Sequence, residues 1–203
     1  RYVQLDGVSL ADPVEAAEWR NARLDFDTRP YPGDHPVQGT EIVPAAVLLN
    51  TFLAAAGAGA ALVDVRLRTP VAPARARNLQ VVLADRELTL ASRLADAAED
   101  QDGGWLTHSS AVVDPDRIEV TDVDLDAARV RCAEPLPPRH VIDTLAELGV
   151  AAMGFGWDIT DLHRGDGELL ARVNSEGDGS QPATWASLVD AATSAASTSF
   201  DGP

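Results

Sequence analysis

The chain has few of the residues that make cross-links, metal sites or membrane spans. Its 203 residues include one cysteine, Cys132, which excludes an internal disulfide, and four scattered histidines without metal-ligand spacing. No apolar run approaches the roughly 18–20 residues of a membrane-spanning helix, and no charged-then-apolar leader opens the sequence. These absences predict a cytoplasmic protein that binds no metal and does not enter a membrane.

Lysine is missing altogether. All 16 basic residues are arginines, and the 32 acidic residues give a net charge of −16. Such a charge repels polyanions, so neither nucleic acid nor an anionic membrane surface is an expected partner. The 45% hydrophobic content is enough for a packed core, which predicts a globular protein.

The segment from His35 to Pro44 places a possible base just ahead of a helix start. Because proline at the first helical position costs no hydrogen bond, Pro44 predicts the opening of a helix. The free N–H groups and positive dipole end at such a start favour an oxyanion or a carbonyl oxygen. With Gly39 four residues after it, His35 is a candidate proton acceptor beside an electrophilic backbone pocket, although a loop histidine is the alternative interpretation.

Hydrophobic patterns in the first half predict one buried helix followed by strands. Residues 41–60 are apolar almost all round, and Gly57 and Gly59 end them. Alternation of apolar and polar residues then predicts four strands. These are 62–68, 78–83, 87–94 and 105–113. A curved antiparallel sheet wrapped around a central helix, the hot-dog arrangement, is the α+β structure expected from this order.

A second unit follows an acidic, proline-bearing segment, 115–138, which we interpret as a linker between 1–114 and 139–203. This unit predicts helix, strand, strand and helix, with Gly149 ending the first helix. The four segments are 140–148, 157–162, 168–173 and 184–197. Because this order does not complete a second hot dog, its closing strands are expected beyond Pro203.

Two further features carry chemistry. Asp190 lies among apolar residues in the last predicted helix, where a charge is costly unless it is paired or protonated. A carboxylic acid with a raised pKa suits a proton donor, although a solvated helix carboxylate is the alternative. Phe155 and Trp157, each preceded by a glycine, form either a plain strand start or the wall of a pocket for a hydrophobic acyl chain. His108, in a strand-like segment, is interpreted as structural.

The pattern His-x-x-x-Gly-x-x-x-x-Pro of His35, Gly39 and Pro44, with Asp190 on the last helix, resembles the dehydratase domains of modular and iterative type I polyketide synthases. The resemblance covers almost the whole chain and implies a double hot-dog fold and a role in secondary metabolism. Ser194 replaces the family's usual Gln or His four residues after the Asp. The segments 35–44 and 149–157 look closest to bacterial iterative synthases that make aromatic acids of the methylsalicylic, orsellinic or naphthoic type.

This resemblance implies a hydro-lyase that eliminates water from a β-hydroxyacyl thioester. His35 would remove the α-proton, Asp190 would protonate the leaving hydroxyl, and the Gly39 N–H or the helix start at Pro44 would stabilise the thioester oxygen. The predicted substrate-binding set is completed by Phe155, Trp157 and Ser194. The substrate would be a polyketide chain on the phosphopantetheine of an acyl carrier protein, with no bound cofactor. The expected partners are that carrier and neighbouring synthase domains, and the parent synthase is expected to be a homodimer.

Two other functions stay open. In the aromatic-acid subgroup the same domain has been described both as a dehydratase and as a thioester hydrolase. For hydrolysis, His35 would activate or direct water to release an aromatic acid from the carrier, and Asp190 would orient rather than donate. The replacement at Ser194 also allows a catalytically inactive scaffold or product-shaping chamber.

Overall fold

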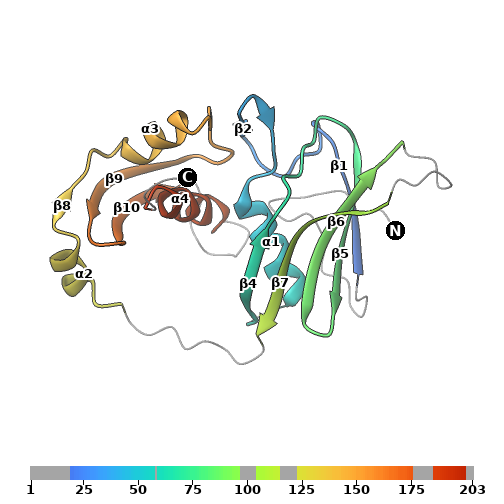
Figure 1. Ribbon diagram of the computed structural model, residues 1–203, viewed down its shortest axis with the longest axis horizontal. Coiled ribbons are helices and arrows are strands. Elements are labelled where there is room, and N and C mark those ends of the chain that lie inside the picture. The colour runs from blue at the N-terminus through green and yellow to red at the C-terminus, as the bar shows by residue number, and fades with distance from the viewer. Residues whose placement is uncertain (1–18, 58, 97–103, 115–122, 176–184, 200–203) are drawn as a thin grey trace. The chain divides into compact units, whose positions relative to one another are not determined.

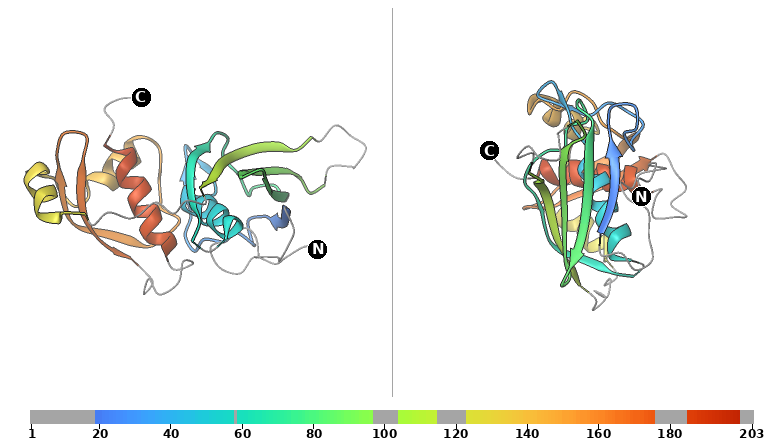
Figure 2. Two further views of the ribbon diagram at one scale, coloured as in Figure 1. Left: turned by 90° about the horizontal axis from the view of Figure 1, so that it is seen from below. Right: turned by 90° about the vertical axis from the view of Figure 1, so that its right-hand side faces the viewer.

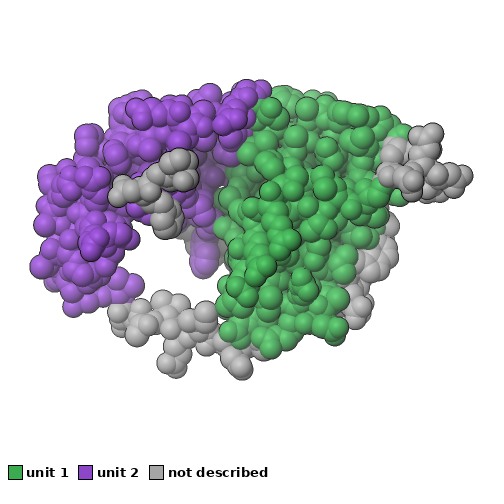
Figure 3. Space-filling model, viewed as in Figure 1, with its two compact units in different colours: residues 1–32, 40–118 green, residues 33–39, 119–203 purple. Residues whose placement is uncertain are grey.

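The computed structural model describes residues 19–57, 59–96, 104–114, 123–175 and 185–199. The chain packs into two compact units (Figure 3). Unit 1 holds residues 1–32 and 40–118, and unit 2 holds residues 33–39 and 119–203. The short segment 33–39 therefore groups with the second half of the chain, while the predicted domain bounds 1–114 and 139–203 stay a prediction.

Among its described residues, unit 1 contains a five-stranded antiparallel sheet and one helix, α1 (Ala45–Ala56) (Figure 1). The strand order is β1-β5-β6-β7-β4. The strands are β1 (Trp19–Leu24), β4 (Ala61–Leu67), β5 (Arg77–Ala84), β6 (Glu87–Leu94) and β7 (Leu106–Asp114). All four strands predicted for this half are confirmed. Strand β1 was not predicted, although Ala22 and Leu24 are buried and alternate with the exposed Arg23, as in a half-buried strand.

Helix α1 packs against the sheet and forms the core of unit 1. It contacts β4, β5, β6 and β7, and Val47 and Phe52 are fully buried. Burial of each such side chain contributes about 1.5–3 kcal/mol. The helix is shorter than the predicted 41–60: it ends at Gly57, whose φ of 94° is a conformation that favours glycine. It is also not buried all round, since Leu53 is 39% exposed.

In the part of unit 2 that the structure describes, a three-stranded sheet is combined with three helices. The sheet order is β10-β9-β8, and α4 packs on β9 and β10, alongside which it lies in Figure 2 (left, red helix and orange strands). The helices are α2 (Leu125–Arg131), α3 (His140–Glu147) and α4 (Ala186–Ser197), and the strands are β8 (Glu134–Pro135), β9 (Trp157–Arg164) and β10 (Leu169–Ser175). The predicted helix 140–148, the strand pair and the last helix are confirmed.

The core of unit 2 is a cluster in which α3, β9 and α4 meet. Its buried members are Val141, Leu145, Ile159, Leu162 and Ala195. The segment predicted as a linker, 115–138, contains α2 and β8. Helix α2 forms because the Asp124 side chain caps it, accepting hydrogen bonds from the N–H groups of Asp126 and Ala127 at 3.1 and 3.0 Å.

Candidate active site

The motif histidine is held by unit 2, although it lies in the first half of the sequence. Its segment, 33–39, pairs along the stretch 149–154 that precedes β9. The contacts are Gly33 N–H to Gly154 O (3.0 Å), Gln38 N–H to Gly149 O (2.7 Å), Ala151 N–H to Pro36 O (3.1 Å) and an antiparallel bridge between Val37 and Val150. Since these contacts lie on both sides of His35, the backbone of this residue is fixed against unit 2.

Glycine makes this close approach feasible. A Cβ atom on Gly33 would lie 2.8 Å from the carbonyl oxygen of Met153, which is closer than real Cβ contacts. Gly149 has a φ of 90°, and a Cβ there would meet the Gln38 side chain at 3.0 Å. The two glycines therefore set the distance between the His35 segment and unit 2.

Gly39 has a local structural role. Strands β2 (Pro36–Val37) and β3 (Thr40–Glu41) form a hairpin whose two turn residues, Gln38 and Gly39, have φ of 49° and 78°. Positive φ at both positions is the type I′ turn, which favours glycine at the second. The spacing from His35 to Gly39 thus encodes this turn, and the predicted use of the Gly39 N–H as an oxyanion donor stays a prediction.

Pro44 lies one position outside α1. We predicted it as the first helical residue, but its ψ of 146° is extended, so it is the N-cap and the helix begins at Ala45. Its carbonyl oxygen accepts from Val47 N–H at 3.0 Å. No side chain caps this helix start. A part for Pro44 in binding the thioester oxygen remains a prediction.

Asp190 is a buried carboxylate on α4. The residue is 3% exposed, and its neighbour Ala191 is fully buried. The indole Nε1–H of Trp157, at the start of β9, donates to Asp190 Oδ2 at 2.9 Å. Burial raises the pKa of the Asp190 carboxyl, while the Trp157 hydrogen bond and the electrostatic interaction with His35 oppose that rise.

His35 and Asp190 therefore interact electrostatically within unit 2. His35 is half-buried and Asp190 is buried, so the two groups differ in their access to solvent. A buried acid with a raised pKa, within the electrostatic influence of a histidine, has the two components of acid–base catalysis. The structure brings these two predicted residues into one unit, although 155 positions separate them in the chain.

Of the other predicted binding residues, two are buried and the third, Trp157, bonds Asp190. Phe155 is 7% exposed and Ser194 is 9% exposed, so both belong to the interior. Trp157 was predicted only as apolar lining, and its hydrogen bond to Asp190 was missed. No sequence pattern pointed to this bond; only the general rule that the indole N–H of a buried tryptophan usually finds a partner did. In the part of the chain that the structure describes, Trp157 is the one side-chain donor to Asp190.

His108 is structural, as its strand position indicated. It is 1% exposed in unit 1, where Nδ1 lies 3.0 Å from the carbonyl oxygen of Thr69 and Nε2 lies 2.7 Å from Ser92 Oγ. Because a carbonyl only accepts, Nδ1 carries the hydrogen and Ser92 donates to Nε2. Arg77 Nη1 in turn donates to Ser92 Oγ at 3.1 Å. Burial lowers the pKa of His108, which favours this neutral form.

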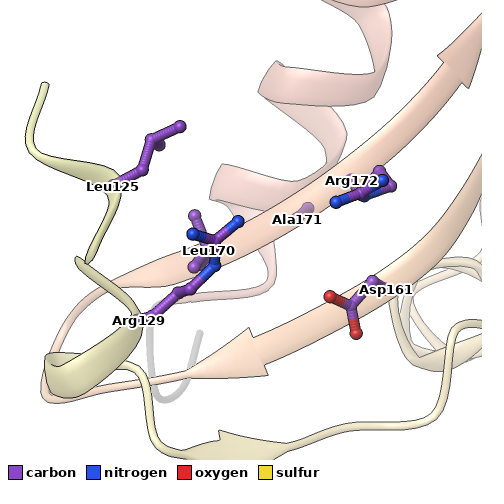
Figure 4. A pocket seen from close by; sticks show the side chains of 6 residues that line it. All are labelled: Leu125, Arg129, Asp161, Leu170, Ala171 and Arg172. Atoms are coloured by element: carbon purple, nitrogen blue, oxygen red, sulfur yellow. The ribbon is translucent and has the colours of Figure 1, made fainter. Parts of the chain in front are cut away.

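Unit 2 also has a pocket of about 170 Å³ between α2 and the β9–β10 hairpin (Figure 4). It is lined by Leu125, Arg129, Asp161, Leu170, Ala171 and Arg172. Neither His35 nor Asp190 lines it. Within the described ranges, no cluster of three or more His, Cys, Asp or Glu side chains could hold a metal ion, and no helix combines the length and apolar character needed to cross a bilayer.

Comparison with known proteins relates the chain to one kind of multidomain enzyme. Residues 6–95 match the family model described as the polyketide synthase dehydratase domain. The 6-methylsalicylic acid synthase of Penicillium patulum is 43% identical over 192 residues, which is 89% of this chain and 11% of that protein. The mellein synthase of Phaeosphaeria nodorum is 31% identical over 184 residues, 87% of this chain and 10% of that protein. The chain thus spans about a tenth of the length of these relatives.

Solved structures show the same fold. A dehydratase domain from the CurF module of curacin polyketide synthase superposes with a TM-score of 0.70 at 16% identity, covering 97% of this chain and 78% of that one. A trans-AT polyketide synthase dehydratase domain from Brevibacillus brevis gives 0.66 at 17% identity, covering 91% and 74%. These matches confirm the predicted α+β hot-dog fold.

The predicted subgroup needs correction. The two synthases named above, to which the chain is similar, come from fungi, so the expected closeness to bacterial synthases is not borne out. The likeness to methylsalicylic acid synthases is itself supported. By a family-model match over residues 6–95, by its relatives and by its fold, the chain is similar to the dehydratase domains of polyketide synthases.

Proposed function

We propose that this domain eliminates water from a β-hydroxyacyl thioester carried on the phosphopantetheine arm of an acyl carrier protein. The observation that carries the proposal is the buried Asp190 carboxyl, with its raised pKa, under the electrostatic influence of His35 in the same unit. Elimination needs one group that accepts a proton and another that donates one. Asp190 and His35 are suited to these opposite roles.

The reaction follows from the two side chains. Neutral His35 accepts the α-proton, the α and β carbons form a double bond, and the β-hydroxyl leaves as water with the proton of Asp190. The step produces an imidazolium and a carboxylate, and these opposite charges stabilise each other. Transfer of a proton from His35 back to Asp190 restores the starting state. The carrier arm holds the thioester near both groups, and such proximity supplies much of the rate.

The relatives suggest the kind of substrate. Similarity to 6-methylsalicylic acid synthases supports a polyketide intermediate on the way to an aromatic acid. In this proposal the buried Phe155 borders the acyl chain, and Gly39 and Pro44 lie near its thioester. The domain works inside a larger synthase, with the acyl carrier protein and neighbouring domains as partners and a homodimer as the parent assembly.

The test is conversion of a β-hydroxyacyl carrier protein, followed by mass spectrometry for the loss of one water. We expect His35→Ala and Asp190→Asn to lower the rate at least about a hundredfold, the usual contribution of a general acid or base. Matched controls in the same unit are His163→Ala and Asp158→Asn. The control residues are a half-buried histidine, bound to exposed Asp161, and an exposed aspartate.

Three results would overturn the proposal. The first is a wild-type rate in His35→Ala. The second is release of free acid from a carrier-bound aromatic product with no dehydration, which would identify a thioester hydrolase. The third is binding of product-like ligands without turnover in either assay, which would identify a scaffold.

A further inference from the structure

Trp157 holds the Asp190 carboxyl by one of its two oxygens. The indole Nε1–H donates to Oδ2 at 2.9 Å, and this nitrogen can only donate. The indole is half-buried and packs against the core cluster of unit 2, so its position is restricted. Asp190 itself is 3% exposed. A short hydrogen bond between two restricted groups fixes the orientation of the carboxyl.

Among the described residues, the other titratable groups near α4 do not hold the Asp190 carboxyl. His35 is the titratable residue whose charge changes the pKa of Asp190. On the elements packed against α4, the charged side chains are exposed, and the histidines are half-buried. The charged residues are Asp143 and Glu147 on α3, Asp158, Asp161 and Arg164 on β9, and Arg172 on β10, and the histidines are His140 and His163.

The hydrogen bond also decides where the proton of neutral Asp190 lies. The carbonyl oxygen of a carboxylic acid is the better acceptor, so the oxygen that receives the indole N–H is the unprotonated one. Oδ2 is that oxygen. When Asp190 is protonated, the proton is therefore on Oδ1, the carboxyl oxygen that does not accept the indole N–H.

The same stretch of chain positions the base. Gly154, three residues before Trp157, accepts the backbone hydrogen bond of Gly33, and Gly149 accepts that of Gln38. Residues 149–157 therefore contact the His35 segment at one end and Asp190 at the other. One segment of chain therefore contacts both the backbone around His35 and the Asp190 carboxyl.

We propose that Trp157 is a positioning residue, whose indole N–H holds Oδ2 of Asp190 so that Oδ1 carries and delivers the proton. This inference rests on the proposed dehydration for its catalytic meaning, while the hold on Asp190 exists without substrate. The indole does not touch the reacting atoms in this proposal; it acts through Asp190.

The experiment separates the donor from the ring. Trp157→Phe keeps an aromatic ring and removes the N–H, whereas Trp157→Gln removes the ring and keeps an N–H donor. Trp105→Phe, at an exposed tryptophan of unit 1, is the matched control. The first readout is the titration of the Asp190 carboxyl without substrate, followed by ¹³C NMR. The second is the pH profile of kcat for dehydration.

We expect Trp157→Phe to raise the Asp190 pKa, to move the alkaline limb of the kcat profile to higher pH, and to lower kcat about tenfold or more with KM little changed. Trp157→Gln should titrate closer to the wild type, and Trp105→Phe should titrate as the wild type. The inference is overturned if Trp157→Phe leaves the Asp190 titration unchanged. It is also overturned if Trp157→Gln, which keeps an N–H donor, raises the Asp190 pKa as much as loss of the donor is expected to raise it. This second result is decisive even if Trp157→Phe does not fold. Because the titration needs no turnover, a failure of the inference is distinct from a failure of the dehydratase proposal.

Discussion

Each unit buries a titratable side chain, and the two side chains differ in how many of their polar atoms are hydrogen-bonded. In unit 1, His108 bonds to Thr69 and Ser92, and Arg77 completes the network. In unit 2, Asp190 is buried, accepts from Trp157 alone among the side chains of the described residues, and interacts electrostatically with His35. A buried group with both polar atoms bonded contributes to stability and has no atom left for a substrate. A buried carboxyl that is hydrogen-bonded at only one of its oxygens can still transfer a proton through the other.

The largest expected effect on stability comes from breaking the unit 1 network. His108→Ala leaves Ser92 and the Thr69 carbonyl without their partner and opens a cavity, so we expect a loss of about 2–4 kcal/mol in the free energy of unfolding. Urea denaturation measures it. His163→Ala is the control, with an expected change within about 0.5 kcal/mol. If His108→Ala remains folded, its dehydration rate should equal that of the wild type. A folded His108→Ala variant that no longer dehydrates would contradict a purely structural role for His108.

A smaller effect is expected at the contact that holds the His35 segment. Gly33→Ala forces a Cβ against the Met153 carbonyl, which lies only 2.8 Å away, so the segment must shift. We expect turnover to fall about tenfold, because misplacement by an ångström of a catalytic group is costly. The stability cost should be about 1–3 kcal/mol. Gly104→Ala, where a Cβ meets open space, is the control. Equal turnover in the two variants would show that this contact does not position His35.

The smallest effect is a gain in stability from removing the acid. Since the folded pKa of Asp190 is raised above the ordinary 3.8, its favourable contribution is complete below that pH and is lost as pH rises through the folded value. Asp190→Asn should therefore be more stable than the wild type at neutral pH, by up to about 1 kcal/mol, and lose this advantage below about pH 4. Thermal melts across pH measure the difference. If Asp190→Asn were less stable than the wild type at neutral pH, the interactions of the Asp190 carboxylate would more than offset the cost of its burial.

Local patterns determined most of the elements. The strands of unit 1 alternate apolar and polar residues, and Gly57 and Gly149 stop helices through positive φ values that other residues disfavour. Helix α2 was missed because the acidic segment 115–138 has the composition of a linker, whereas a side-chain cap at Asp124 and an arginine-bearing last turn support a short helix there.

The sequence by itself determined most of the hot-dog elements and the apolar surroundings of Asp190 in its helix, because these depend on neighbours a few residues apart. Only the tertiary structure decided that the His35 segment pairs with residues 149–154 and that Trp157 bonds Asp190. Those contacts join residues more than 30 positions apart. Their formation depends on chain packing, close approach at Gly33 and the direction of one indole N–H, none of which a local pattern specifies.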